Sequence, residues 1–290
     1  MRFSFAESMT DPSYYLPLAQ AVEEAGFDGF IVPDSICYPE VSDSTYPYTP
    51  DGNREFLEDK PFIEPFTLIP AMAAVTERIT FTTFVMKLPI RNPVLVAKSA
   101  ASVAVMSDNR FNVGVGTSPW PDDYEICGVP WAGRGKRMDE MIDIIQGLGT
   151  GDYFSYDGEI FTVPSAKICP VPTEPLPIMI GGHGDKALRR AARLDGWLHA
   201  GGDPELLDGL LAKLSDYRRE LGREDEPFST FVISIEAYTP EGIEKLEARG
   251  ITDVIVGFRD AYDLAQDTQS LEEKIGAIQW YADEVIAKVR

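Results

Sequence analysis

The stretch IMIGGHGDKALRRAARLDGW, residues 178–197, contains residue types that could bind an anion. Gly181 and Gly182 end a short apolar run, and His183 and Gly184 follow directly. Glycine lets the backbone approach a ligand closely, and the first turn of a helix presents N–H groups without partners and a partial positive charge. We therefore predict that these four residues, just before a helix, form a seat for a phosphate group.

Four basic side chains follow the glycines: Lys186, Arg189, Arg190 and Arg193. This density is unexpected in a chain whose formal net charge is −21. Lys186 falls in the first turn of the predicted helix, where its charge would add to the anion seat. The three arginines fall one to two turns further on, so we interpret them as a solvated helix face.

The composition disfavours several classes of function. The acidic balance argues against nucleic acid and anionic membrane as partners. No run of about 18 apolar residues predicts a membrane span, and the first residues lack the apolar core of a secretory signal. Cys37, Cys127 and Cys169 are widely spaced and fit no CxxC pattern, so we expect neither a disulfide framework nor a metal site. These features predict a cytoplasmic protein that acts on a small molecule.

Short apolar stretches alternate with amphipathic helical stretches along the whole chain. We expect strands at 2–7, 27–33, 79–89, 110–116, 176–182, 195–201, 229–235 and 252–258. A helical pattern follows each strand, and helix N-caps are predicted at Asp11, Thr239 and Ser270. Eight β–α units in one order predict an α/β fold, a (β/α)8 TIM barrel that residues 1–290 form as one domain.

Two insertions interrupt this order. Residues 34–63 follow the second strand and are expected to form a mobile lid. Residues 117–175 follow the fourth strand and include a predicted β-hairpin at 151–163. Barrel enzymes build their sites from loops at the carboxyl ends of strands. The insertions carry six aromatic residues that would stack on a planar ring or simply pack the loops: Tyr38, Tyr46, Tyr48, Trp120, Tyr124 and Trp131.

Two ionisable side chains fall at predicted strand ends. The amine of Lys87 either reaches water beyond the barrel lip or faces a ligand, and we expect water, the commoner arrangement for lysine. His199 ends the sixth strand on the catalytic face. It is a candidate acid, with a structural role as the alternative.

Four segments together resemble the bacterial luciferase-like oxidoreductases. They are ERITFTTFVMKLPIRNPVLVAKSAASV, RFNVGVGTSPWPDDYEICGVPWAGRGKRMDEMI, YDGEIF and PIMIGGHGDKALRRAARLDGW, in this order. Within that family the chain is most similar to the shorter branch that uses the deazaflavin coenzyme F420. The resemblance implies a TIM barrel, a flavin or deazaflavin in the barrel mouth with its phosphate on Gly181 and Gly182, and a homodimer.

The resemblance also implies which residues contact the coenzyme. It places a non-proline cis peptide bond within Thr83–Phe84–Val85, where it would support one face of the ring. It implies coenzyme contacts for Asp34 and, after the fourth strand, for Gly116 and Thr117.

Two positions depart from the pattern of related proteins. Ser35 stands where many of them carry a histidine that acts on the substrate. Pro119 stands nearest the catalytic glutamate of the sugar-phosphate dehydrogenases, which argues against that particular reaction. The proton donor is therefore open, with His199, Trp120 and Ser35 as candidates.

We predict an oxidoreductase that transfers a hydride between C5 of coenzyme F420 and a small organic substrate. The length of 290 residues favours deazaflavin over FMN, because the FMN-dependent monooxygenases of this family tend to be longer. An FMN-dependent luciferase-like monooxygenase is the first alternative. Two others are a phosphate-binding aldolase or isomerase, with Lys87 as its Schiff-base lysine, and a catalytically silent flavin-binding barrel.

Overall fold

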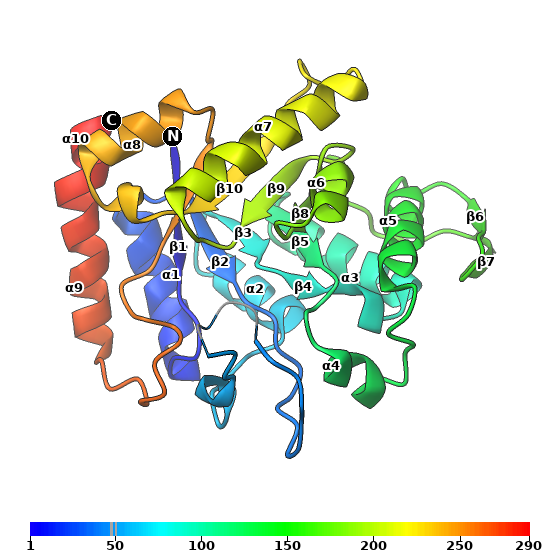
Figure 1. Ribbon diagram of the computed structural model, residues 1–290, viewed down its shortest axis with the longest axis horizontal. Helices are drawn as coiled ribbons and strands as arrows, with labels where there is room; N and C mark the ends of the chain where they lie inside the picture. The colour runs from blue at the N-terminus through cyan, green and yellow to red at the C-terminus, as the bar shows by residue number, and fades with distance from the viewer. Residues whose placement is uncertain (47–48, 50) are drawn as a thin grey trace.

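Figure 1 shows a barrel of strands surrounded by helices, in a computed structural model that describes residues 1–46, 49 and 51–290. Its strands are β1 (Arg2–Ala6), β2 (Gly29–Val32), β3 (Thr80–Thr83), β4 (Met86–Lys87), β5 (Phe111–Gly116), β8 (Ile178–Gly181), β9 (Gly196–His199), β10 (Ser229–Ile233) and β11 (Asp253–Val256). Parallel pairing runs in the order β3-β2-β1-β11-β10-β9-β8-β5-β4, and pairing of β3 with β5 closes the sheet. Since β3 and β4 are two pieces of one barrel strand, the predicted (β/α)8 barrel is confirmed.

A helix follows each barrel strand and covers the outside of the sheet (Figure 1). These helices are α1 (Tyr15–Glu24), α2 (Pro65–Ala73), α3 (Pro93–Met106), α5 (Arg134–Gly149), α6 (Asp185–Ala191), α7 (Pro204–Glu220), α8 (Pro240–Ala248) and α9 (Leu271–Tyr281). Shorter helical pieces are η1 (Pro12–Tyr14), η2 (Glu55–Leu57), η3 (Leu88–Ile90), α4 (Pro121–Ile126), η4 (Ile235–Tyr238), η5 (Ala282–Ile286) and α10 (Ala287–Val289). The N-caps predicted at Asp11, Thr239 and Ser270 are confirmed, the last as a capping box with Glu273. Among the residues described, no helix is long and apolar enough to span a membrane.

Side chains alternate between the two faces of the barrel wall. The outward face packs against the helices in a large buried cluster that includes Phe5, Val113 and Trp197. The inward face fills the barrel with a smaller cluster, here called the inner cluster: Ile31, Met179, Leu198, Phe231 and Ile255. Alternation along β9 therefore puts Leu198 inside the barrel and puts Trp197 and His199 on the outer face.

The third barrel strand, predicted as one strand over 79–89, is divided by an irregular step. β3 ends at Thr83, a cis peptide bond joins Phe84 to Val85, and β4 then re-enters the sheet. The cis bond lies where the family resemblance implied it. The buried hydroxyl of Thr83 donates to the carbonyl oxygen of Gly114 at 2.8 Å, so Thr83 supports the wall rather than an exposed coenzyme surface.

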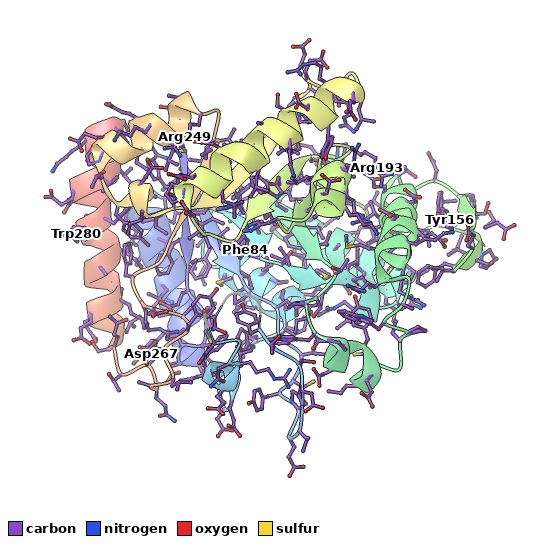
Figure 2. The ribbon with its side chains drawn as sticks, viewed as in Figure 1. Phe84, Tyr156, Arg193, Arg249, Asp267 and Trp280 are labelled. Carbon is purple, nitrogen blue, oxygen red and sulfur yellow. The ribbon has the colours of Figure 1, made fainter. Side chains whose placement is uncertain are left out.

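The two insertions lie in different parts of the molecule. The connection from β2 to α2 runs along the lower edge of Figure 1, close to α4. The predicted hairpin is confirmed as antiparallel strands β6 (Phe154–Asp157) and β7 (Thr162–Ala166). It follows α5 and projects at the right, and Figure 2 shows Tyr156 of the hairpin far from Phe84 in the barrel. The hairpin therefore contributes nothing to the barrel mouth.

Candidate active site

Val85 forms a platform at the carboxyl end of the barrel, between glycines on two neighbouring strands. A Cβ atom on Gly116 would lie 2.7 Å from Cγ2 of Val85, and one on Gly181 would lie 2.6 Å from Cγ1. Neither position accepts a side chain unless Val85 moves. Phe84 and Val85 are half-buried and pack on the inner cluster, and Phe84 lies in the middle of the barrel in Figure 2. The mouth therefore has an apolar floor, and the residues that flank it on β5 and β8, Gly116 and Gly181, carry no side chains.

The predicted anion seat follows directly after this platform. Gly182 has a φ of +119°, a conformation that favours glycine, and Gly184 is the N-cap of α6. The space around a Cβ at Gly184 is open, and Lys186 is exposed in the first turn. Asp185 brings a negative charge to the same turn, but its carboxylate accepts a hydrogen bond from a tyrosine hydroxyl on α7. The backbone N–H groups at the start of α6 and the Lys186 amine therefore remain as the groups that could bind an anion.

The three arginines in and just after α6 connect helices. Arg189 pairs with Glu220 of α7 at 3.2 Å. Arg190 and Arg193 both pair with Asp139 of α5, at 2.6 and 3.1 Å. Arg189 and Arg193 are exposed, as the solvated helix face requires, whereas the Arg190 side chain is only 12% exposed. The basic cluster therefore ties α6 to its neighbours instead of lining the mouth.

Lys87 contradicts the expectation that its amine lies in water. Met86 and its partner Val115 belong to the outer core, so the next pair along the strands, Lys87 and Gly116, lies toward the mouth. The Lys87 side chain is 8% exposed, and Nζ lies 2.9 Å from Oδ2 of Asp123 in α4. The prediction failed because α4, which supplies this carboxylate, was not predicted.

Asp123 belongs to a small buried polar group at the start of α4. The Ser118 hydroxyl donates to Oδ2 of Asp123 at 2.5 Å and accepts from the backbone N–H of Trp120 at 3.1 Å. The Trp120 ring lies under the Lys87 amine, 4.7 Å from Nζ to the ring centroid. Within the part of the chain described, the Trp120 indole N–H has no acceptor, and Nζ of Lys87 has none beyond its ion pair with Asp123. Two buried donors are thus left at the mouth.

Asp34, implied as a coenzyme contact, is engaged by protein groups. Its Oδ2 accepts from the backbone N–H of Lys87 at 2.8 Å, and its Oδ1 pairs with Arg91 at 2.9 Å. The Asp34 side chain is 1% exposed, so it fixes β4 against the end of β2 and offers no free oxygen to a coenzyme. Its neighbour Ser35 is half-buried and stays a candidate.

His199 ends β9 at the carboxyl end of the barrel, as expected, but its ring does not point into the barrel. The ring is on the outer face of β9, 1% exposed, and stacks on the His183 ring with centroids 4.5 Å apart. Burial, helped by the neighbouring His183, lowers the pKa of His199 to about 4, and burial lowers the pKa of His183 as well. His199 is therefore neutral at pH 7 and is not carried forward as the acid. His183 uses Nε2 to accept from the Ala200 N–H at 3.2 Å.

Aromatic side chains from three loops meet beside Lys87, around the Trp120 ring that its amine covers. The four residues, here called the aromatic cover, are Tyr46, Phe56, Trp120 and Tyr262. The Tyr46 ring centroid lies 5.2 Å from Phe56, 5.5 Å from Trp120 and 5.8 Å from Tyr262. Arg54 fastens the insertion, since it pairs with Asp122 at 3.2 Å and lies 5.3 Å from the Trp120 ring centroid. These contacts hold the insertion against Trp120, whose ring lies next to the Lys87 amine.

The other aromatic candidates have separate positions. The Arg54 guanidinium lies over the Tyr38 ring, with Cζ 5.5 Å from the ring centroid. Tyr124 and Trp131 pack edge to face at 4.9 Å, which is the ordinary loop packing considered above. Tyr48 lies outside the described residues.

A buried ion-pair network anchors the loop that carries Tyr262. Lys274 of α9 lies 2.7 Å from Asp267 and 3.2 Å from Glu7, which follows β1. Arg259 joins the group at 3.5 Å from Asp267. Burial raises the pKa of Glu7, although the charge of Lys274 opposes the shift. No sequence motif indicated this network, because its members are up to 267 positions apart.

A second hollow, of about 730 Å³, lies at the opposite end of the barrel. Four of its charged side chains form two ion pairs, Arg2 with Asp253 and Arg290 with Asp28. Two others bond to the backbone: Arg78 donates to the Glu23 carbonyl oxygen, and Asp195 accepts from the Ile178 N–H. In the described residues, no cluster of three or more His, Cys, Asp or Glu side chains could hold a metal ion.

The barrel, the divided third strand and the glycine-flanked platform accompany a sequence match over nearly the whole chain. The family model described as luciferase-like monooxygenase matches residues 3–284. The chain belongs to this family. An uncharacterized protein of Mycobacterium bovis is 56% identical over the full length of both chains. An F420-dependent glucose-6-phosphate dehydrogenase of Nakamurella multipartita is 30% identical over 80% of this chain and 66% of its own length.

Solved structures of this luciferase-like fold include enzymes with either coenzyme. The coenzyme F420-dependent tetrahydromethanopterin reductase of Methanopyrus kandleri superposes with a TM-score of 0.75 at 16% identity, covering 100% of this chain and 99% of the other. An oxygenating subunit of 3,6-diketocamphane monooxygenase from Pseudomonas putida, in complex with FMN, gives the same TM-score at 14% identity and the same coverage. At these identities the likeness establishes the fold, and the coenzyme must be argued from the residues.

Proposed function

We propose that this luciferase-like protein is a deazaflavin-dependent oxidoreductase that seats coenzyme F420 on the platform. The observation that carries the proposal is the strip of four glycines, Gly116, Gly181, Gly182 and Gly184, of which the last two flank His183. A planar ring needs a flat apolar surface, and a phosphate needs N–H groups that no Cβ obstructs. When bound, the coenzyme supplies hydride transfer at C5.

Each part of the strip has a task in this proposal. Val85 and Phe84 would support one face of the ring, with Thr117 at its edge. The loop from Gly182 to Gly184 and the first turn of α6 would hold the phosphate, with Lys186 close by. The closed aromatic cover would exclude water from the exposed face of the ring.

Deazaflavin is favoured over FMN by two curated relatives. The proteins from Nakamurella multipartita and Microbacterium testaceum, each 30% identical, are named as F420-dependent dehydrogenases. Chain length does not separate the two coenzymes, because the chain covers 99% of an F420-dependent reductase and 99% of an FMN-bound oxygenase alike. An FMN-dependent monooxygenase remains the alternative function. The aldolase or isomerase is disfavoured, because the Lys87 amine, its proposed nucleophile, is engaged in an ion pair with Asp123.

The remaining expectations stay predictions: a small organic substrate, a homodimer and a cytoplasmic location. Sugar phosphates are not favoured as substrates, since Pro119 stands where a catalytic glutamate would be needed.

Coenzyme binding to a variant of the strip tests the proposal. Gly182→Val introduces a β-branched side chain at a φ of +119°, and its Cβ would lie 3.2 Å from the Ala187 Cβ. Titration of coenzyme F420 into the parent should quench the coenzyme's fluorescence, and Gly182→Val should lose at least tenfold in affinity, about 1.4 kcal/mol. Gly128→Val also changes a glycine of positive φ but lies away from the strip, so it serves as the control. Equal affinity of the parent and Gly182→Val would place the phosphate elsewhere.

A further inference from the structure

We propose that Lys87 binds the oxygen atom of the substrate, and that the substrate is a neutral carbonyl compound or the corresponding alcohol. This inference rests on the proposed function, because it assigns the second reactant of that hydride transfer. It starts from the two buried donors at the mouth, Nζ of Lys87 and the indole N–H of Trp120, which find no further acceptor among the described residues.

Lys87 borders the platform, and Trp120 lies next to its amine. The register of β4 and β5 sets Lys87 opposite Gly116, one of the two platform glycines. From there the amine reaches over the face of Trp120, with Nζ 4.7 Å from the ring centroid. A donor held in this position would lie beside a molecule stacked on the exposed face of the ring.

An ammonium group has three protons, and one carboxylate does not satisfy them all. The Lys87 side chain is 92% buried and its carboxylate partner Asp123 is 97% buried, so bulk water does not replace the missing acceptors. Buried polar groups without hydrogen bonds are costly, and their presence at a mouth indicates that a ligand completes them. The aromatic cover closes over the amine, so the ligand enters when the cover opens.

The charges around the amine favour a neutral oxygen. Lys87 is matched by Asp123, and Arg54, which also lies over the Trp120 ring, is matched by Asp122. A carboxylate ligand would add an uncompensated negative charge next to Asp123 in a buried site. A carbonyl oxygen adds no charge and can accept a hydrogen bond from the Lys87 ammonium.

The chemistry of the proposed reaction needs a cation at this oxygen. When a carbonyl carbon gains a hydride from the reduced deazaflavin, a C–H bond forms and the π electron pair of C=O moves onto oxygen. The Lys87 ammonium stabilises that negative charge and transfers one proton to the oxygen, which yields the alcohol. Lys87 regains its proton from water when the cover opens. In the opposite direction the hydroxyl proton passes to the Lys87 amine as the carbon loses its hydride to the oxidised coenzyme.

The experiment follows the indole N–H resonance of Trp120, assigned with Trp120→Phe, while three ketones are titrated: acetone, cyclohexanone and acetophenone. The parent is measured with and without coenzyme F420. We expect at least one ketone to shift the signal of the parent, and Lys87→Met to weaken that binding at least tenfold, ~1.4 kcal/mol. Lys288→Met is the matched control, because Lys288 also pairs with a carboxylate but is exposed, and it should bind the ketone like the parent.

Further variants separate ligand binding from folding. Lys87→Met leaves the Asp123 carboxylate without its cation, so Lys87→Met/Asp123→Asn repeats the test with the whole pair neutralised. Lys87→Arg keeps the charge and should keep more ketone affinity than either. The inference is wrong if the parent binds none of the three ketones, or if the double variant binds them as tightly as the parent. Permanent alkylation of Lys87 by acetone and cyanoborohydride would reveal a Schiff base and also overturn it.

Titration of coenzyme F420 into the same proteins keeps the two proposals apart. The Lys87 variants should retain the coenzyme affinity of the parent within about twofold, because their change concerns the second reactant. A parent that binds a ketone through Lys87 but binds no coenzyme F420 would contradict the proposed function and leave the oxygen-binding role intact.

Discussion

Val85 occupies the space that a side chain at Gly181 would need, because a Cβ atom on Gly181 would lie 2.6 Å from Cγ1 of Val85. The same valine blocks Gly116 with its other methyl group, at 2.7 Å. One side chain on the divided third strand thus requires glycine on the next two strands of the barrel. The glycine pair at the end of β8 therefore has a packing reason as well as the anion-binding one considered first.

This contact predicts an energetic coupling between the two positions. Gly181→Ala should destabilise the protein by about 1–3 kcal/mol, because the added methyl overpacks against Val85. In a Val85→Ala background the same substitution should cost much less, since the blocking methyl groups are gone. Urea unfolding of the four proteins measures the coupling, and strictly additive effects would mean that the Gly181 backbone, and not Val85, sets the cost.

A charge change at Lys186, in the predicted anion seat, should affect binding of coenzyme F420 more than a charge change elsewhere. Coenzyme F420 is anionic, and the protein carries a formal net charge of −21. Salt screens distant charges over roughly 8–10 Å, so a local contact should dominate. Lys186→Glu should weaken binding of coenzyme F420 about tenfold or more, ~1.4 kcal/mol. Lys288→Glu should have little effect, and an equal loss in both would show that net charge alone is being measured.

His199 should make stability depend on pH. Its pKa is lowered to about 4 in the folded protein, whereas an unfolded histidine titrates near 6.5. Between these two pKa values the unfolded chain binds a proton on His199 that the folded protein does not bind. The contribution of neutral His199 to the free energy of unfolding is therefore fully present above about pH 6.5 and is lost as the pH falls toward 4. The loss at pH 5 should be about 2 kcal/mol relative to pH 7. Denaturant unfolding should find a flatter profile for His199→Gln, and identical profiles would exclude His199 as the cause.

Opening of the insertion at 34–63 should be visible to proteases. We expect this segment to be cleaved before other parts of the protein, and coenzyme F420 to slow the cleavage. Arg54→Met removes the ion pair with Asp122, so opening should become easier by about 1 kcal/mol and cleavage about fivefold faster. Arg219→Met, which removes an exposed ion pair with Asp216, should leave the rate unchanged. A cleavage rate that changes neither with coenzyme F420 nor with Arg54→Met would count against a lid.

Local signals accounted for most of the fold. The strand and helix periodicities, the capping box at Ser270 and the hairpin at 151–163 depend on residues close in sequence, and all are present. The step at Phe84–Val85 was accessible through family resemblance alone, because no local composition marks it.

The misplaced site residues depended on distant partners or on strand parity. Lys87 is buried because it meets Asp123, 36 positions away on a helix that was not predicted. Asp34 is occupied because Arg91 reaches it across 57 positions. His199 faces outward because Leu198 faces inward, but a strand of a parallel barrel is apolar on both sides, so its sequence does not show which face is which.

Competition between the two coenzymes tests the central claim most directly. The purified protein is dialysed against equal concentrations of coenzyme F420 and FMN, and the bound coenzyme is identified from its visible absorption spectrum after removal of the free ligands. The account predicts that the deazaflavin is bound in clear excess, and that Gly182→Val retains neither coenzyme. Bound FMN in excess over coenzyme F420 would contradict the proposed function and identify the protein as a flavin enzyme of the same family.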